Sequence, residues 1–91
     1  MTGGWEYADM KPCDLPQEVA TAFSEAFSRL MGTDFIPVLY VGSQVVNGMN
    51  YCIVCKTKMV VPNGADGCKV VILYAPIGQK AVVTDIYDVI R

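Results

Sequence analysis

The chain has 91 residues, the size of one small domain, and 53% of them are hydrophobic, which is ample for a core at this length. Seven basic and nine acidic residues give a net charge of −2, without the basic stripe of a nucleic-acid-binding protein. No apolar run approaches the roughly 18 residues of a membrane helix, and histidine, the usual general base and metal ligand, is absent. We expect one soluble domain over residues 1–91, not an enzyme, with no cofactor, metal, membrane or nucleic-acid partner.

The N-terminus and the cysteines leave the compartment open. MTGGWEYADM shows no charged region followed by an apolar one, so no signal peptide is visible. Cys13, Cys52, Cys55 and Cys68 allow two disulfides or none. Cys52 and Cys55 have the spacing of a redox or zinc motif, but residues three apart in a strand face opposite sides of a sheet. We expect free thiols that are half-buried or in the core, and a disulfide from Cys13 to another cysteine stays open.

The first clear element is a helix from about Leu15 to Met31, after a short stretch at 3–10 with strand-like alternation. Asp14 is the predicted N-cap, with Gln17 three residues on as in a capping box, and Gly32 is a natural stop. Apolar residues at three- and four-residue steps give the helix one hydrophobic face; they are Val19, Ala22, Phe23, Ala26, Phe27 and Leu30.

Four strand-like runs follow, rich in β-branched and aromatic residues; they lie at 34–44, 49–61, 67–75 and 80–90. Lys56 and Lys58 place one face of the second run in water, so alternate residues face the helix; these are Tyr51, Ile53, Cys55, Thr57 and Met59. Asn47-Gly48 predicts a two-residue hairpin turn, and Pro37 predicts a bulge or a place where the neighbouring strand ends. The expected fold is α+β, in the order β-α-β-β-β-β, with one helix packed across a four- to five-stranded antiparallel meander.

Meander geometry brings two of the predicted turns to one edge of the sheet. The start of the first segment joins them if that segment pairs antiparallel with residues 34–44. The three segments are Gly3-Gly4-Trp5, Gln44 to Gly48 and Pro76-Ile77-Gly78, and none of them carries a charge. An apolar, uncharged loop edge on a small domain indicates a binding site.

These segments resemble those of the cystatin and stefin superfamily. Gln44, Val46 and Gly48 match, in register, the family's Gln-x-Val-x-Gly hairpin loop, and GMNY from Gly48 is similar to its Gly-x-Asn-Tyr. Gly3-Gly4 resembles the N-terminal glycine pair, and Pro76 resembles the proline of the second loop. The order of helix before meander also agrees, so the resemblance covers nearly the whole chain.

The chain departs from the family pattern at four points. Asn47 stands where the family usually has alanine. Pro76-Ile77 replaces the proline-tryptophan pair of secreted cystatins and is closer to stefins. Only Met1-Thr2 precede the glycine pair, and the cysteine positions do not reproduce the two disulfides of the secreted group.

The resemblance implies a cystatin-like fold and a tight, reversible inhibitor of papain-like cysteine peptidases. A three-part hydrophobic wedge would block the active-site cleft of the peptidase without being cleaved. The implied protease-binding residues are Gly3, Gly4, Trp5, Gln44, Val45, Val46, Asn47, Gly48, Pro76 and Ile77.

Other interpretations of the same residues stay open. Gly3-Gly4 could be a tail, Trp5 a lid on the core, and Gln44 to Gly48 a plain turn. The second class of function is a non-inhibitory cystatin-like binding or structural module. The β-branched Val45 and Val46 strain a tight turn, so we expect a monomer that can form a domain-swapped dimer through this hinge.

Overall fold

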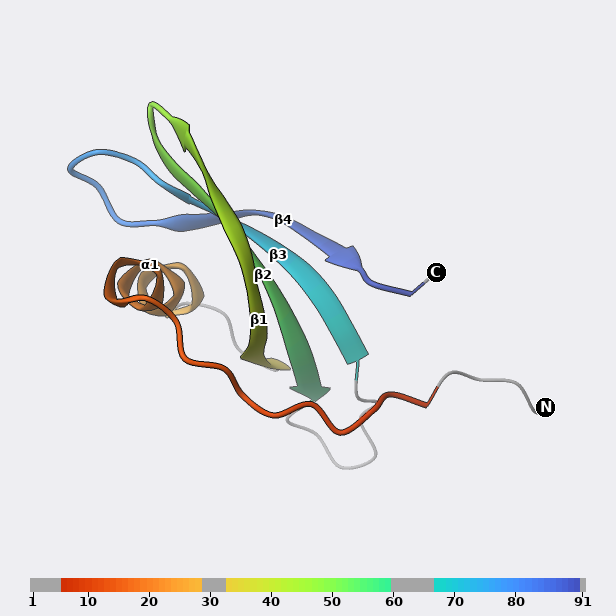
Figure 1. Cartoon of the computed structure of the whole chain (residues 1–91). Helices are drawn as coiled ribbons and strands as arrows, with labels where there is room; N and C mark the ends of the chain where they lie inside the picture. Colours follow the sequence, from red (N-terminus) through yellow and green to blue (C-terminus); the bar gives the residue numbers. More distant parts are fainter. Residues whose placement is uncertain (1–5, 29–32, 60–66, 91) are drawn as a thin grey trace.

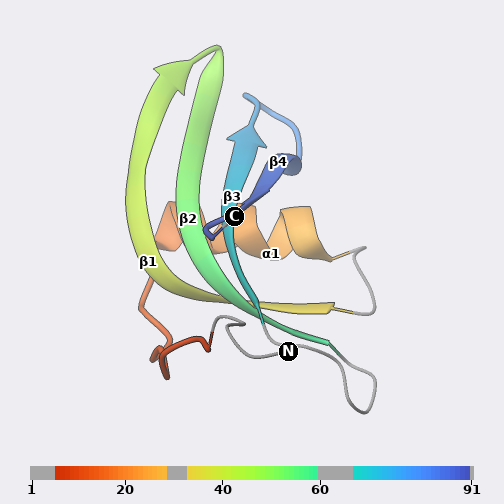
Figure 2. The same ribbon diagram turned by 90° about the vertical axis from the view of Figure 1, so that its right-hand side faces the viewer.

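The computed structural model describes residues 6–28, 33–59 and 67–90 (Figure 1). Its elements, in chain order, are α1 (Gln17–Phe27), β1 (Thr33–Val46), β2 (Gly48–Met59), β3 (Gly67–Ala75) and β4 (Val82–Asp88). The strands form one antiparallel sheet in the order β1-β2-β3-β4, and α1 crosses behind it in Figure 2. The α+β class and the meander of four strands after one helix are confirmed.

The first predicted strand does not form in its described part. Residues 6–10 have no regular secondary structure, so the prediction of a fifth strand is wrong for them, and residues 1–5 lie outside the described ranges. The sheet of the described residues therefore has four strands, and β1 is an edge strand.

The predicted N-cap of the helix is also wrong. The helix begins at Gln17, two residues later than expected, and the N-cap residue is Pro16, with no side-chain cap hydrogen bond. The carbonyl of Pro16 accepts the hydrogen bond from the amide of Ala20 at 2.8 Å. Proline donates no backbone hydrogen bond and restricts Leu15 before it to extended conformations, so Asp14 cannot serve as the N-cap. The helix ends at Phe27, with Ser28 as the C-cap, four residues before the expected end at Met31. The predicted stop residue, Gly32, lies outside the described residues.

The bulge predicted in the first strand is present, but the two-residue turn predicted at Asn47-Gly48 is wrong. The register of β1 against β2 shifts between Pro37 and Leu39, which confirms the bulge expected at the proline. The first hairpin is tighter than expected, because Val46 pairs with Gly48 and leaves Asn47 alone at the tip.

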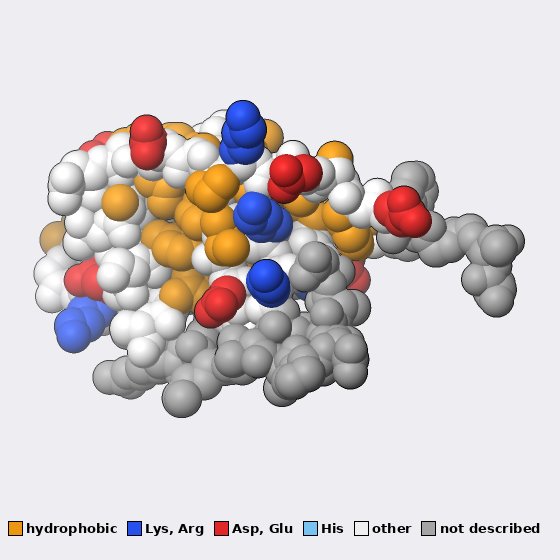
Figure 3. All heavy atoms as spheres, turned by 90° about the horizontal axis from the view of Figure 1, so that it is seen from below, with side chains coloured by type: hydrophobic (Ala, Val, Ile, Leu, Met, Phe, Trp, Pro, Cys, Tyr) orange, Lys and Arg blue, Asp and Glu red, His pale blue; other side chains and the backbone are white. Residues whose placement is uncertain are grey.

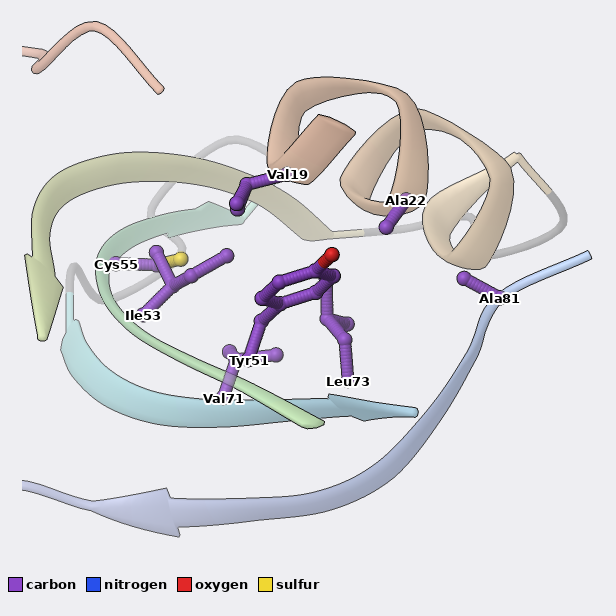
Figure 4. Close-up of a cluster of buried hydrophobic side chains, with 8 residues drawn as sticks. All are labelled: Val19, Ala22, Tyr51, Ile53, Cys55, Val71, Leu73 and Ala81. Carbon is purple, nitrogen blue, oxygen red and sulfur yellow. The ribbon is translucent and has the colours of Figure 1, made fainter. Parts of the chain in front are cut away.

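The core lies between α1 and the inner face of the sheet (Figure 4). Its buried side chains come from the helix, β2, β3 and the residue before β4; they are Val19, Ala22, Tyr51, Ile53, Cys55, Val71, Leu73 and Ala81. Thr57 is buried as well. The alternation predicted for β2 is therefore confirmed from Tyr51 to Thr57, and the side chain of Met59 lies outside the described part. The rings of Phe23, Phe27 and Phe35 extend the core toward the start of β1.

The N-terminal segment runs along the end of the sheet remote from the first hairpin. The amide of Cys13 donates to the carbonyl of Pro37 at 2.9 Å, and Lys56 Nζ donates to the carbonyl of Met10 at 2.6 Å. In Figure 2 the segment from residue 6 onward lies low in the view, whereas the β1–β2 hairpin is at the top. Tyr7, Met10 and Lys58 share one hollow there. We call the part of the sheet that this segment contacts, around Pro37, Lys56 and Lys58, the covered end.

The underside of the molecule carries charges of both signs. In Figure 3, seen from below, hydrophobic side chains form a broken band with lysines and acidic side chains interspersed. The described helix is neither long nor apolar enough to cross a membrane.

Candidate functional site

The β1–β2 turn and the β3–β4 connection lie side by side at one edge of the sheet. Met49, just after the first turn, pairs with Ala75, just before the second loop. Val45, Val46, Pro76 and Ile77 line a common groove with the two strand ends. We call residues 44–48 and 76–78 together the hairpin edge. The structure thus brings together two of the three predicted segments.

Gly48 lets the two loops of the hairpin edge approach each other. Its φ is +115°, and a Cβ atom at this position would lie 2.4 Å from the carbonyl oxygen of Ala75 and 3.0 Å from Cα of Pro76. Both features require glycine, because other residues rarely adopt this φ and a Cβ atom would collide with fixed backbone. The glycine of the hairpin motif therefore has a structural role within this chain: it fixes the spacing of the two loops.

Polar side chains fix the shape of the first loop. Tyr74 Oη donates to the carbonyl of Asn47 at 2.6 Å and so holds the tip against β3. Asn50 Nδ2 donates to Gln44 Oε1 at 3.0 Å across the hairpin. Gln44 is thereby engaged in the turn itself, and its carboxamide orients the loop.

Two apolar side chains stand out of the hairpin edge. Val45 is 80% exposed and Ile77 is 78% exposed, the largest values among the exposed large hydrophobic residues described, while Val46 is 41% exposed. None of residues 44–48 and 76–78 is charged. Exposed apolar side chains on a tight, hydrogen-bonded turn favour binding to an apolar recess of another molecule.

The third predicted segment is not placed. Gly3, Gly4 and Trp5 lie outside the described residues. The part of the segment that is described, from Tyr7 to Met10, contacts the covered end and not the hairpin edge. The expectation that this segment pairs with residues 34–44 and converges on the two hairpins is therefore not met by residues 6–10.

The cysteines are free thiols in the structure, as expected. Cys55 faces the core and Cys52 the opposite side of the sheet, in line with their spacing along β2. Burial, reinforced by Cys13 and Cys68, raises the pKa of Cys55 from 9.0 to about 12, and burial also raises the pKa of Cys52. Such thiols are poor nucleophiles and poor metal ligands. No group of metal-binding side chains occurs among the described residues.

Sequence reasoning missed the residues of α1 that adjoin the hairpin edge. Glu18 and Glu25 line the groove with Val45 and Ile77. Their seven-residue spacing puts both carboxylates on one face of the helix, next to the apolar stripe. That spacing is visible in the sequence, but its position behind the hairpins depends on how α1 crosses the sheet.

Comparisons of the chain with protein-family models, with curated proteins and with solved structures give no match. The resemblance to cystatins and stefins therefore rests on the loop residues and on the order of the elements.

Proposed function

We propose that this protein is a reversible inhibitor of papain-like cysteine peptidases with a cystatin-like fold. The observation that carries the proposal is the hairpin edge, in which Val45 and Ile77 project at exposed fractions of 80% and 78% from two uncharged loops held together at Gly48. The match of Gln44, Val46 and Gly48 to the inhibitor loop motif supports the same function.

Inhibition would consist of occupying the cleft, with no covalent step. Each apolar side chain that enters the cleft contributes about 25 cal/mol per Å² of buried surface. The hydrogen bonds at Asn47 and Gln44 hold the first loop in shape before it binds, which lowers the entropy cost of docking. Gly3, Gly4 and Trp5 keep their predicted role as a third contact.

The proposal is tested by titrating the protein against papain with a fluorogenic peptide substrate. We expect competitive inhibition at nanomolar to micromolar concentration. Ile77→Asp should raise the inhibition constant about 30-fold or more, because it places a charge in an apolar contact. Val89→Asp is the matched control, since Val89 is exposed and its amide bonds to the carbonyl of Cys68 near the covered end. Folded protein without inhibition at high concentration would refute the proposal.

A second candidate is a self-associating module without inhibitory activity. It is favoured by the outer face of the sheet, where Leu39 is 56% and Tyr87 49% exposed and Val54 and Val70 lie between them in register. Exchange of α1 and β1 through the turn at Asn47 would be a second route to dimers. Size-exclusion chromatography over a concentration series should show dimers in this case, and only monomer, even after heating, would exclude it.

A further inference from the structure

A groove of about 560 Å³ runs behind the hairpin edge, between the two loops and α1. Its loop side is apolar, with Val45 and Ile77 at the rim, whereas its helix side carries Glu18 and Glu25. Lys80, the nearest basic residue in sequence to the second loop, lines other hollows, and none of the described residues that line this groove is basic. The groove therefore combines apolar walls with uncompensated negative charge.

Tyr51 adds a polar group to the floor of this groove. Its side chain rises from β2 toward α1 (Figure 4) and the residue is only 6% exposed. Within the described ranges no side chain or backbone group forms a hydrogen bond with its hydroxyl, which is not sealed from the groove. Because the hydroxyl is open to the groove, water or a ligand can form a hydrogen bond with it. Burial raises the pKa of Tyr51, and the nearby charge of Glu18 raises it further, so the hydroxyl keeps its proton.

Glu25 retains acceptor capacity as well. Its Oε1 accepts a hydrogen bond from the amide of Ala81 at 3.2 Å, which fixes the side chain and leaves Oε2 for another donor. Ala22 lies between the two glutamates on the helix and is buried. The groove therefore sets two carboxylates and the Tyr51 hydroxyl beside apolar surface, which suits a donor at the end of an aliphatic chain.

We propose that this groove binds a lysine or arginine side chain of a partner protein. The aliphatic stem lies against Val45 and Ile77, and the cationic head lies between the Glu18 carboxylate and the Tyr51 hydroxyl. Long basic side chains place their methylene groups on apolar surface while the charged head bonds to acceptors. Recognition of a basic side chain at this site does not require that the partner be a peptidase.

The test is an NMR titration of the ¹⁵N-labelled full chain with acetyl-Val-Arg-Val-amide. We expect saturable shifts of the amides of Ala22, Met49 and Ile77. A peptide with citrulline in place of arginine has the same shape without the charge, and it should bind at least about threefold more weakly. Glu18→Gln should lower the affinity for the arginine peptide by a similar factor and abolish the preference over citrulline. Glu6→Gln, an exposed acidic residue of the N-terminal segment, should change neither.

Several outcomes would overturn the proposal. Equal binding of the arginine and citrulline peptides would show an apolar groove without cation recognition. An absence of shifts at millimolar peptide would show no site. Shifts at the same amides on raising the protein concentration alone would show that a second copy of the chain occupies the groove. A folded Glu18→Gln variant that binds the arginine peptide as well as the wild type would remove the assigned carboxylate. Papain inhibition is measured separately. Each outcome of the peptide titration can be interpreted whether or not the protein inhibits papain.

Discussion

The covered end and the hairpin edge differ in the contacts and charges that the chain places there. At the covered end, the N-terminal segment is held to β1 and β2 by hydrogen bonds from Cys13 and Lys56, and Lys69 forms an ion pair with Asp88. At the hairpin edge no charged side chain is present, and Val45 and Ile77 stay in water. Among the described residues no segment packs over Val45 and Ile77, as their exposure shows, and we infer that this apolar end is available to a partner.

The largest loss of stability is expected from a substitution at Gly48, where the two loops of the hairpin edge meet. Gly48→Ala should lower the free energy of unfolding by roughly 3 kcal/mol, because alanine disfavours the φ of +115° and its Cβ would meet the carbonyl of Ala75. Gly42→Ala is the control: nothing lies within 4 Å of a Cβ there and its φ is not positive, so the change should stay within about 0.5 kcal/mol. Urea denaturation measures both, and equal effects would contradict the role assigned to Gly48. Substitution of Gly48 by a charged residue would disturb the sheet through the same backbone contacts. A loss of inhibition in such a variant would therefore not distinguish lost binding from lost structure.

The core that joins the two ends should show its burial in the pH dependence of stability. The pKa of Cys55 rises from 9.0 to about 12 on folding, so between these values the folded thiol keeps a proton that the unfolded thiol loses. The contribution of the protonated Cys55 thiol to the free energy of unfolding is fully present below pH 9. It is lost as the pH rises toward 12, and the free energy of unfolding then falls by up to about 1.4 kcal/mol per pH unit.

Denaturation from pH 8 to 11 tests this slope. Other groups with raised pKa values, Tyr51 and Cys52 among them, contribute in the same direction. In Cys55→Ala the free energy of unfolding should therefore fall less steeply with pH, by the contribution of about one proton. This difference in slope is separate from any loss of stability through poorer packing. An unchanged slope in this variant would contradict the assignment.

The covered end can be loosened without touching the hairpin edge. Lys56→Met removes the hydrogen bond from Lys56 Nζ to the carbonyl of Met10 and should cost about 1 kcal/mol. It should also speed hydrogen exchange or proteolysis in residues 6–12. Lys58→Met is the control, because Lys58 lines the same hollow but forms no hydrogen bond with the described residues 6–12. Papain inhibition should be unchanged in both variants, and a loss with Lys56→Met alone would show that the covered end takes part in binding.

The smallest effect is expected at Tyr74. Tyr74→Phe removes the hydrogen bond to the carbonyl of Asn47, an exposed contact, and should cost about 0.5 kcal/mol of stability. Because this bond holds the tip of the first loop, we expect a few-fold rise in the inhibition constant for papain. Tyr87→Phe, which loses only the contact of its hydroxyl with Asp85, should leave inhibition unchanged.

Much of the fold could be predicted from local sequence patterns. Alternation in β2 identified Tyr51, Ile53, Cys55 and Thr57 as inward-facing, because the side-chain period of a strand is two. Pro37 predicted its bulge because proline cannot donate to the ladder. The start of the helix was misplaced because the conformational restriction of Pro16 outweighed the side-chain signal of Asp14.

The candidate site was only partly accessible to the same reasoning. Two loops at one edge follow from meander connectivity, so the proximity of Val46 and Pro76 could be expected. The path of residues 6–13 depends on contacts distant in sequence, such as Lys56 with Met10, for which no local pattern exists. The place of Glu18 behind the loops depends in the same way on the crossing of α1 over the sheet.

The most direct test of the account is hydrogen exchange of the amides, measured for the free protein and for its complex with papain. We predict that saturating papain slows exchange at residues 45–49 and 77–79 and leaves residues 6–13 unchanged. Protection confined to residues 6–13, or no protection anywhere at saturating papain, would contradict the assignment of the hairpin edge as the peptidase-binding surface.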